Sequence, residues 1–134
     1  MDPGSGVRLA SANEWVKVMA RILSVSYDVA LLSSRQLLLE SLGWEVTSAS
    51  DFAQALQYCS QPTRFDLFVL GHSIPWPERK SLVAAFRAHS TAPVIALSKI
   101  GEEPTTGADL HIEPDPDRLL AAISGLISPK AATA

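Results

Sequence analysis

The chain has 134 residues, of which 47 % are hydrophobic and 19 % are charged, a composition typical of one soluble globular domain. Its net charge of −3 provides no basic surface field, which argues against nucleic acid as a direct ligand. The single cysteine, Cys59, excludes an internal disulfide framework and indicates a reducing compartment. No apolar stretch approaches the roughly 18 residues of a membrane span, and no signal peptide opens the chain. We therefore predict a cytoplasmic protein that does not contact a membrane.

The first 18 residues, MDPGSGVRLASANEWVKV, begin with turn formers and show no clear periodicity. The stretch that starts at Met19 would make a natural second beginning. We therefore predict that residues 1–18 form a leader or an N-terminal extension outside the fold, that 19–128 form the domain, and that 129–134 form a flexible tail.

Strand-like and helix-like segments alternate through the first half of the domain. Residues 22–25 form a short apolar run. Asp28 then opens a helix that Gly43 ends, with one apolar face made of Leu31, Leu38 and Leu42. Residues 44–49 alternate between apolar and polar, as an edge strand does. Ser50 can cap the next helix, whose inward residues are Phe52, Ala55, Leu56 and Cys59.

The second half repeats this alternation. Residues 67–70 and 94–97 are continuous apolar runs, and 109–112 alternate. The helix between the first two of these strands has Leu82, Val83, Ala85 and Phe86 as its apolar residues. Asp115 caps a last helix with Pro116 at its first position, and the inward residues of this helix are Leu119, Leu120, Ile123 and Ile127.

Strands buried on both faces form continuous apolar runs, whereas edge strands alternate. Three central strands and two edge strands predict a five-stranded parallel sheet of order 2-1-3-4-5. This is the flavodoxin-like three-layer α/β/α sandwich, in which the loops after Val25, Leu70 and Leu97 meet. Only eleven residues, SKIGEEPTTGA, separate the last two strands. Because a parallel crossover normally takes a dozen or more residues, we expect the fourth helix to be short or absent.

Five segments in this order resemble the receiver domain of two-component response regulators over about residues 20–127. They are RILSVSYD, GWEVTSASDFAQAL, FDLFVLGHSIP, APVIALS and GADLHIEPDPDRLLAAI. The resemblance implies an aspartate after strand three that accepts a phosphoryl group, and an acidic pair after strand one that holds magnesium. It also implies a Ser or Thr after strand four and a lysine before a proline after strand five. The matching residues here are Gly71 for the acceptor, Ser26 and Tyr27 for the acidic pair with Asp28 beside them, Ser98, and Glu113.

Only Ser98 keeps the residue type that the resemblance implies; the aromatic position in strand five is Leu110. Glycine has no side chain with which to attack a phosphoryl donor, and magnesium prefers carboxylate oxygens. Glu113 reverses the charge at the point where phosphate must be neutralised. We therefore interpret the chain as a pseudo-receiver that binds no metal or cofactor and is not an enzyme.

Several residues allow two interpretations. His72 is a solvated loop residue or a phosphorylation or metal site, and the first is favoured because no further ligand lies at suitable spacing. Cys59 is best read as a small core residue. Asp28 is favoured as a helix cap over a cation ligand shared with Glu113. Trp76, between two prolines, either forms part of an interaction loop or folds back over the altered pocket.

The leading hypothesis is a receiver-like module that acts through a protein partner (a kinase, a regulator or an output protein), independently of phosphorylation. A homodimer is possible through the first helix, the last helix or the loop with His72 and Trp76. The alternative is a sensor domain regulated by a small molecule or ion at the altered pocket. A hydrolase or transferase is disfavoured because the chain has no G-x-S-x-G elbow and no Gly-rich phosphate loop.

Overall fold

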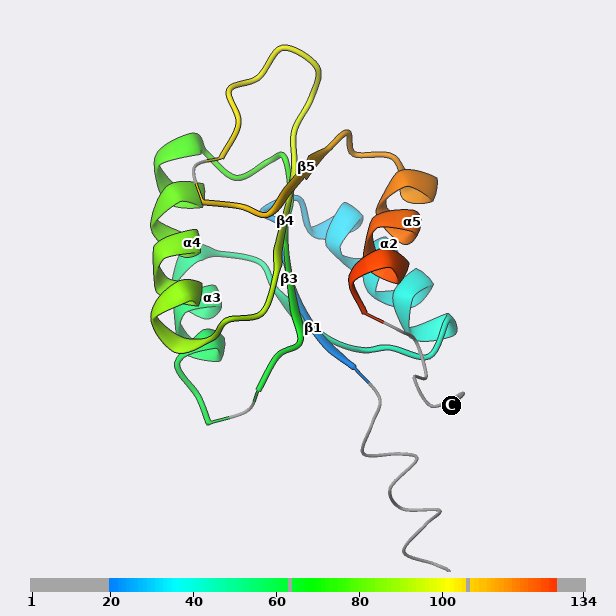
Figure 1. The fold of residues 1–134 in the computed structure, drawn as a ribbon, viewed down its shortest axis with the longest axis horizontal. Helices are drawn as coiled ribbons and strands as arrows, with labels where there is room; N and C mark the ends of the chain where they lie inside the picture. Colours follow the sequence, from blue (N-terminus) through cyan, green and yellow to red (C-terminus); the bar gives the residue numbers. More distant parts are fainter. Residues whose placement is uncertain (1–19, 63, 106, 128–134) are drawn as a thin grey trace, which may run out of the picture.

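The computed structural model describes residues 20–62, 64–105 and 107–127. In this part of the chain a single sheet lies between two pairs of helices, with α3 and α4 on one face and α2 and α5 on the other (Figure 1). The predicted leader at 1–18 and the tail at 129–134 lie outside the described residues. None of the described helices combines the length and the apolar character that crossing a membrane requires.

The sheet has five parallel strands in the order β2-β1-β3-β4-β5, which confirms the predicted topology. Val25 pairs with Ala49 on one side and with Leu70 on the other, so β1, β2 and β3 end at the same level. The strands are β1 (Arg21–Val25), β2 (Glu45–Ala49), β3 (Leu67–Leu70), β4 (Val94–Leu97) and β5 (Leu110–Ile112).

The helices begin at side-chain caps or prolines and end near the residues that the sequence indicates. They are α2 (Val29–Ser41), α3 (Phe52–Cys59), α4 (Trp76–His89) and α5 (Pro116–Leu126). Asp28 caps α2 and Asp115 caps α5, as predicted, and Gly43 adopts the left-handed φ of 99° after α2. The predicted cap at Ser50 is wrong. Asp51 caps α3 instead, because its carboxylate accepts from the Gln54 amide at 2.7 Å.

Two further expectations need correction. In α2 the residues buried against the sheet are Leu32 and Leu39, whereas the predicted face at Leu31 and Leu38 is half-buried and Leu42 is 44 % exposed. Leucines occupy two adjacent stripes of this helix, and its rotation on the sheet decides which stripe is buried. Trp76 is the first residue of α4 and not part of a loop, because the prolines that flank it bracket the helix start, where proline is favoured.

The core has two parts because successive strand residues point to opposite faces of the sheet. Leu23, Phe68 and Leu70 pack with α3 and α4, and on that face Phe68 stacks on Phe86 of α4 with ring centroids 4.2 Å apart. Ile22 and Val69 pack on the other face with α2 and α5. The predicted inward residues of α3 and α5 all belong to these two groups.

No helix forms between β4 and β5 in the described residues, as the short connection predicts. Figure 1 shows this connection as a yellow loop that projects beyond the carboxyl edge of the sheet. The fold therefore has four helices around five strands over its described part. The carboxyl edge is consequently bordered by loops after β1, β3, β4 and β5.

Candidate functional site

Ser26, Gly71 and Ser98 follow β1, β3 and β4 directly and lie at the carboxyl edge of the sheet. The Gly71 amide donates to the Val25 carbonyl at 2.8 Å, which extends the pairing of β1 and β3 by one residue. Ligands of open α/β sheets bind at this edge, where the strand order reverses. The structure therefore brings together the predicted positions after β1, β3 and β4.

A pair of serine hydroxyls joins the loops after β1 and β3. Ser26 Oγ and Ser73 Oγ lie 3.2 Å apart, and Ser73 Oγ accepts from the Tyr27 amide at 3.1 Å. Ser26 is fully buried, and its Oγ also accepts from the Asp28 amide at 3.2 Å. Because these hydroxyls already hold backbone groups, they fix the shape of the site.

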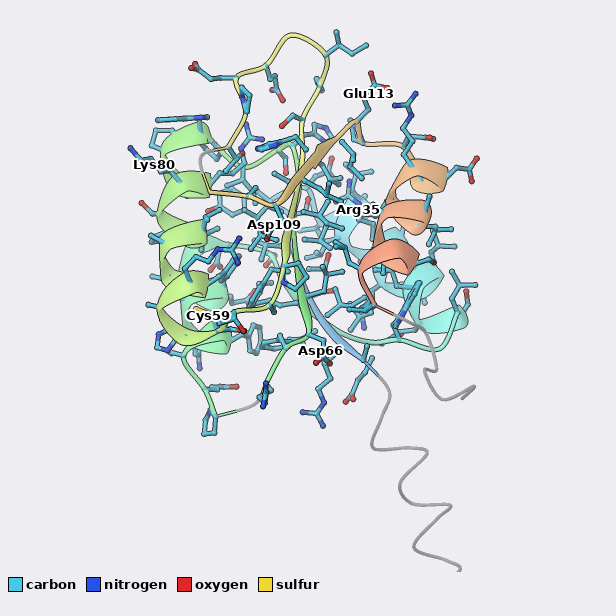
Figure 2. The ribbon with its side chains drawn as sticks, viewed as in Figure 1. Arg35, Cys59, Asp66, Lys80, Asp109 and Glu113 are labelled. Carbon is cyan, nitrogen blue, oxygen red and sulfur yellow. The ribbon has the colours of Figure 1, made fainter. Side chains whose placement is uncertain are left out.

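The guanidinium of Arg35, from α2, lies over Gly71. A Cβ atom on Gly71 would lie 3.2 Å from Arg35 Nη1 and 3.1 Å from Ser26 Cβ, so the guanidinium occupies the space that a side chain at position 71 would enter. Arg35 Nη1 is buried and has no hydrogen-bond partner among the described residues. Burial lowers the pKa of the Arg35 guanidinium, an effect that the nearby Asp28 carboxylate opposes. Figure 2 shows Arg35 on the α2 and α5 side of the sheet.

A second arginine approaches the edge from α4. Arg79 is 4 % exposed, and its Nη1 donates to the Leu97 carbonyl at 3.2 Å and to Ser98 Oγ at 3.3 Å. Its Nε is buried and has no hydrogen-bond partner within the described part of the chain. Ser98, the one predicted position that keeps the expected residue type, therefore accepts a hydrogen bond from an internal cation.

The carboxylates near this edge have partners elsewhere. Asp28 Oδ1 accepts from the Leu31 amide at 3.2 Å and caps α2, which is the favoured reading of this residue. Tyr27 donates its hydroxyl to Glu78, and burial together with this bond raises the pKa of Tyr27. Glu113 faces Arg118 of α5 at 3.7 Å. Among the described residues no three side chains of the metal-ligating types come together.

His72 and Trp76 line an open hollow of about 500 Å³ on the α4 side, together with Arg79 and two glutamates of the β4–β5 connection. Trp76 Nε1 donates to the Pro104 carbonyl at 3.4 Å, and Lys80 Nζ lies 5.5 Å from the ring centroid. The half-buried indole therefore lies against the β4–β5 connection.

The environment of His72 leads to a measurable pH dependence. Burial lowers the pKa of His72, and Lys99 and Arg35 lower it further, against Glu102 and Asp28. The unfolded chain then binds more protons than the folded chain below the ordinary pKa of about 6.5. The stability that His72 contributes is therefore present above that pH and is lost as the pH falls through the lowered pKa.

We expect an NMR titration to give His72 a pKa below its ordinary value, and Lys99→Met to raise this pKa because it removes a repelling charge. Lys80→Met is the matched control, since Lys80 is an exposed lysine without this effect on His72. A His72 pKa at or above about 6.5 in the unmodified chain would contradict the described environment.

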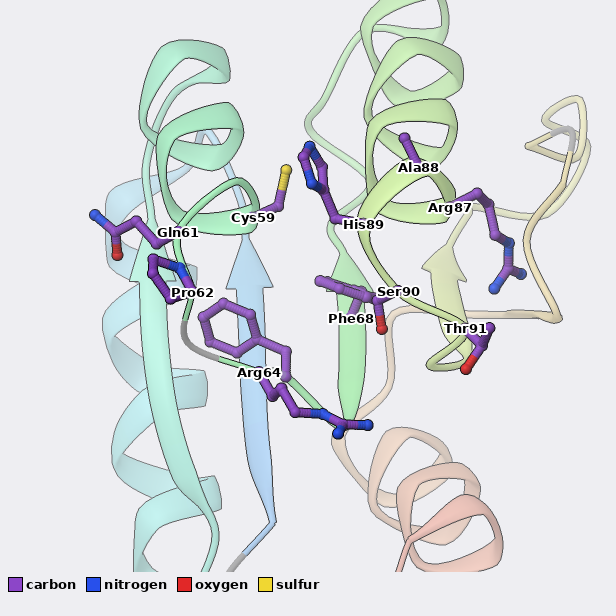
Figure 3. Close-up of a pocket in the computed structure, with 11 residues that line it drawn as sticks. Cys59, Gln61, Pro62, Arg64, Phe68, Arg87, Ala88, His89, Ser90 and Thr91 are labelled. Carbon is purple, nitrogen blue, oxygen red and sulfur yellow. The ribbon is translucent and has the colours of Figure 1, made fainter.

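A larger hollow of about 650 Å³ lies at the opposite edge of the sheet, between the ends of α3 and α4. Figure 3 shows Cys59 and His89 beside this hollow, at the ends of these two helices. Cys59 is 5 % exposed, and burial raises the pKa of its thiol, which disfavours the reactive thiolate. This confirms Cys59 as a core residue and leaves the carboxyl edge as the candidate site.

Arg35 and Arg79 are not among the site residues that the sequence predicts. Both come from helices, away from the loops on which the expected site residues lie. One signal was present for Arg35, which is the only basic residue between Arg21 and Arg64 and lies between Leu31 and Leu38 at helical spacing. An arginine on an apolar stripe extends its stem along that surface toward a polar edge.

Comparisons with known proteins agree with this architecture. No family model and no curated protein matches the sequence. The structure is similar to response regulator TrrA from Thermotoga maritima in complex with Mg²⁺-BeF (TM-score 0.70, 21 % identity, 81 % of this chain, 100 % of that chain). It is also similar to a CheY-like receiver domain protein from Methanospirillum hungatei (0.71, 24 %, 87 % and 99 %).

A third similar structure is the receiver domain of sensor histidine kinase PA1611 from Pseudomonas aeruginosa, which has a coordinated magnesium ion (0.69, 20 %, 81 % and 98 %). Each comparison covers nearly all of the other chain and most of this one. At identities of 20 to 24 % the similarity is one of fold. The chain therefore has the fold of response-regulator receiver domains, with Gly71 and an arginine guanidinium at the edge where ligands of such sheets bind.

Proposed function

We propose that this chain is a receiver-like signalling module that takes up no phosphoryl group at its carboxyl edge and acts by binding a protein partner. One observation carries the proposal: the residue after β3 is Gly71, and the guanidinium of Arg35 lies over it. Aspartyl phosphate formation needs a carboxylate nucleophile at this point. An arginine and a glycine offer none.

The residues at this edge do not fit a magnesium ion. Asp28 is committed to capping α2, and Ser26 Oγ to the turn after β1. The half-buried guanidinium of Arg35 would repel a divalent cation, because like charges repel more strongly where water is partly excluded. We therefore propose that the module is not an enzyme and uses no metal or cofactor.

A protein partner is supported by the proteins that share the fold. One is a receiver domain of a sensor histidine kinase, and another is the N-terminal domain of the nisin resistance regulator NsrR. We propose a kinase, a regulator or an output protein as the partner in the cytoplasm, without nucleic acid or membrane. A homodimer would use α2, α5 or the surface around Trp76, because the β4–β5 connection offers no helix in its described residues.

The test is incubation with magnesium and acetyl phosphate, followed by intact mass spectrometry. We expect no increase by the mass of one phosphoryl group, and no change of the Gly71 amide in an NMR spectrum with beryllofluoride. The Thermotoga maritima protein, whose structure contains Mg²⁺-BeF, serves as the positive control. A phosphoryl adduct on any residue of this edge, His72 included, would overturn the proposal.

A second arm tests the mode of action. Affinity for a candidate kinase domain, measured by light scattering, should be the same with and without the phosphoryl donor. A gain of about tenfold with the donor, equivalent to about 1.4 kcal/mol, would contradict independence from phosphorylation. The absence of any complex across the candidate kinases and regulators would count against the partner itself.

The second candidate function is control by a small molecule or ion at the altered pocket. Arg35 Nη1 favours it, because a buried donor without a partner is costly and a ligand acceptor would relieve that cost. A thermal-shift screen in which no compound stabilises the protein would contradict it, since any ligand of the native state raises stability by mass action.

A further inference from the structure

A cavity of about 160 Å³ opens between α2 and α5, next to the end of β4. It lies on the α2 and α5 side of the sheet, on which Figure 2 places Arg35. Its apolar lining consists of Leu31, Leu38, Leu97, Pro114, Pro116 and Leu119. The leucine stripe of α2 that the sequence predicted to face the core therefore faces this cavity instead.

Arg35 is the one cation among the described residues that line this cavity, and its buried Nη1, beside Gly71 and Ser26, has no hydrogen-bond partner in the described part of the chain. The carboxylate in the lining, Asp115, accepts from the Arg118 amide at 3.3 Å and lies 4.0 Å from Arg118 Nε. Asp115 is thus committed to the first turn of α5. The cavity consequently combines an apolar wall with a guanidinium that forms no ion pair among the described residues, although the nearby Asp28 carboxylate favours its charged form.

We propose that this cavity binds a small organic monocarboxylate, whose carboxylate pairs with Arg35 and whose apolar body packs among the leucines of α2 and α5. A guanidinium donates two parallel hydrogen bonds to one carboxylate, which is its best-matched partner in shape and charge. Arg35 is half-buried, and a buried donor without a partner is costly, so a carboxylate that pairs with the guanidinium relieves part of that cost as it binds.

Other ligand classes fit the lining less well. Inorganic phosphate would bring a strongly hydrated dianion into a mostly apolar cavity with one cation. A neutral apolar ligand would leave Arg35 without a partner, and an organic cation would be repelled. Cavities of about 150 Å³ accept a benzene-sized body, so an aromatic or branched acid of about nine heavy atoms matches the volume and the charge together.

This site goes beyond the proposed function, because carboxylate binding does not depend on whether the module is phosphorylated. It also places a ligand-binding group beside Gly71. The guanidinium that would hold the ligand is the group that covers Gly71 and neighbours Ser26 at the carboxyl edge. A bound carboxylate would fix the position of that guanidinium and of the edge around it.

Benzoate is the probe, and benzamide, which has the same shape and no charge, is the matched control. We expect benzoate to raise the melting temperature and to shift the amide signals of Leu31, Leu38 and Leu119 in NMR spectra of the full chain. Benzamide should bind at least about tenfold more weakly. Inorganic phosphate at the same ionic strength should leave these three signals unchanged.

Two variants test the role of Arg35. Arg35→Met keeps much of the length and removes the charge, and it should weaken benzoate binding at least about tenfold. Gly71→Asp would place an internal carboxylate beside Arg35 Nη1, whereas Gly71→Asn adds a side chain of the same shape without charge. The new carboxylate should therefore compete with benzoate for Arg35, and Gly71→Asp should weaken benzoate binding more than Gly71→Asn does. This pair of variants keeps the test decisive if Arg35→Met fails to fold.

Equal binding of benzoate and benzamide, or unchanged benzoate affinity in Arg35→Met, would overturn the proposal. So would the absence of any benzoate-dependent shift at the three leucines, or an equal response to inorganic phosphate. None of these outcomes alters the mass-spectrometric test of phosphorylation. Failure of this inference is thus distinguishable from failure of the proposed function.

Discussion

A Gly71→Asp variant is expected to take up no phosphoryl group from acetyl phosphate and magnesium, although it restores a carboxylate after β3. The new Cβ would lie 3.2 Å from Arg35 Nη1, so the carboxylate would form an ion pair with the half-buried guanidinium. A carboxylate held in such a pair is a weak nucleophile. The variant would also still lack an acidic pair for magnesium, because Ser26 and Tyr27 stand at those positions.

Intact mass spectrometry checks this expectation, with the Thermotoga maritima protein as the positive control and Gly71→Asn as the negative one. We expect the mass increase of one phosphoryl group in the Thermotoga maritima protein and no such increase in Gly71→Asp. A mass increase by one phosphoryl group in Gly71→Asp, absent from Gly71→Asn, would show that Arg35 does not block the position. In that case the acceptor aspartate would be the one group that phosphorylation needs at this edge.

Replacing Phe86 by alanine is expected to lower the free energy of unfolding by about 3–5 kcal/mol. Phe86 is fully buried on α4, and its ring stacks on Phe68 of β3 with an interplanar angle of 7°. The substitution leaves a cavity between α4 and the sheet and removes the aromatic pair. Because domains of this size are stable by only about 5–15 kcal/mol, the loss is a large share of the total.

Urea denaturation followed by circular dichroism measures this loss. Leu37→Ala is the control, because Leu37 is a large apolar side chain that is 71 % exposed on α2, and its removal should change stability by no more than about 0.5 kcal/mol. A loss below about 1.5 kcal/mol for Phe86→Ala would mean that α4 does not pack on β3 as described. It would also contradict the described position of Arg79, because the same helix places this residue beside Ser98.

Local sequence signals were sufficient for the strand order and for the absence of a helix between β4 and β5. A strand that is buried on both faces is apolar at every position, whereas a strand that is buried on one face alternates between apolar and polar residues. The residues of the strand itself therefore distinguish the two cases. The caps at Asp28 and Asp115 and the turn at Gly43 are equally local, because a cap bonds to an amide three residues away. The carboxyl-edge positions Ser26, Gly71 and Ser98 follow directly from the strand ends.

The tertiary structure decided the features that depend on contacts between distant segments. α2 offers two stripes of leucine, and only its rotation on the sheet determined that Leu32 and Leu39 are buried while Leu31 and Leu38 face a cavity. The guanidinium of Arg35 lies over Gly71, and Arg79 donates to Ser98. These residues are far apart in the chain, and no local sequence pattern predicts that they lie together. Patterns in neighbouring residues reflect burial and backbone conformation. The contact between a guanidinium on a helix and a glycine after a strand forms only when the helix packs on the sheet.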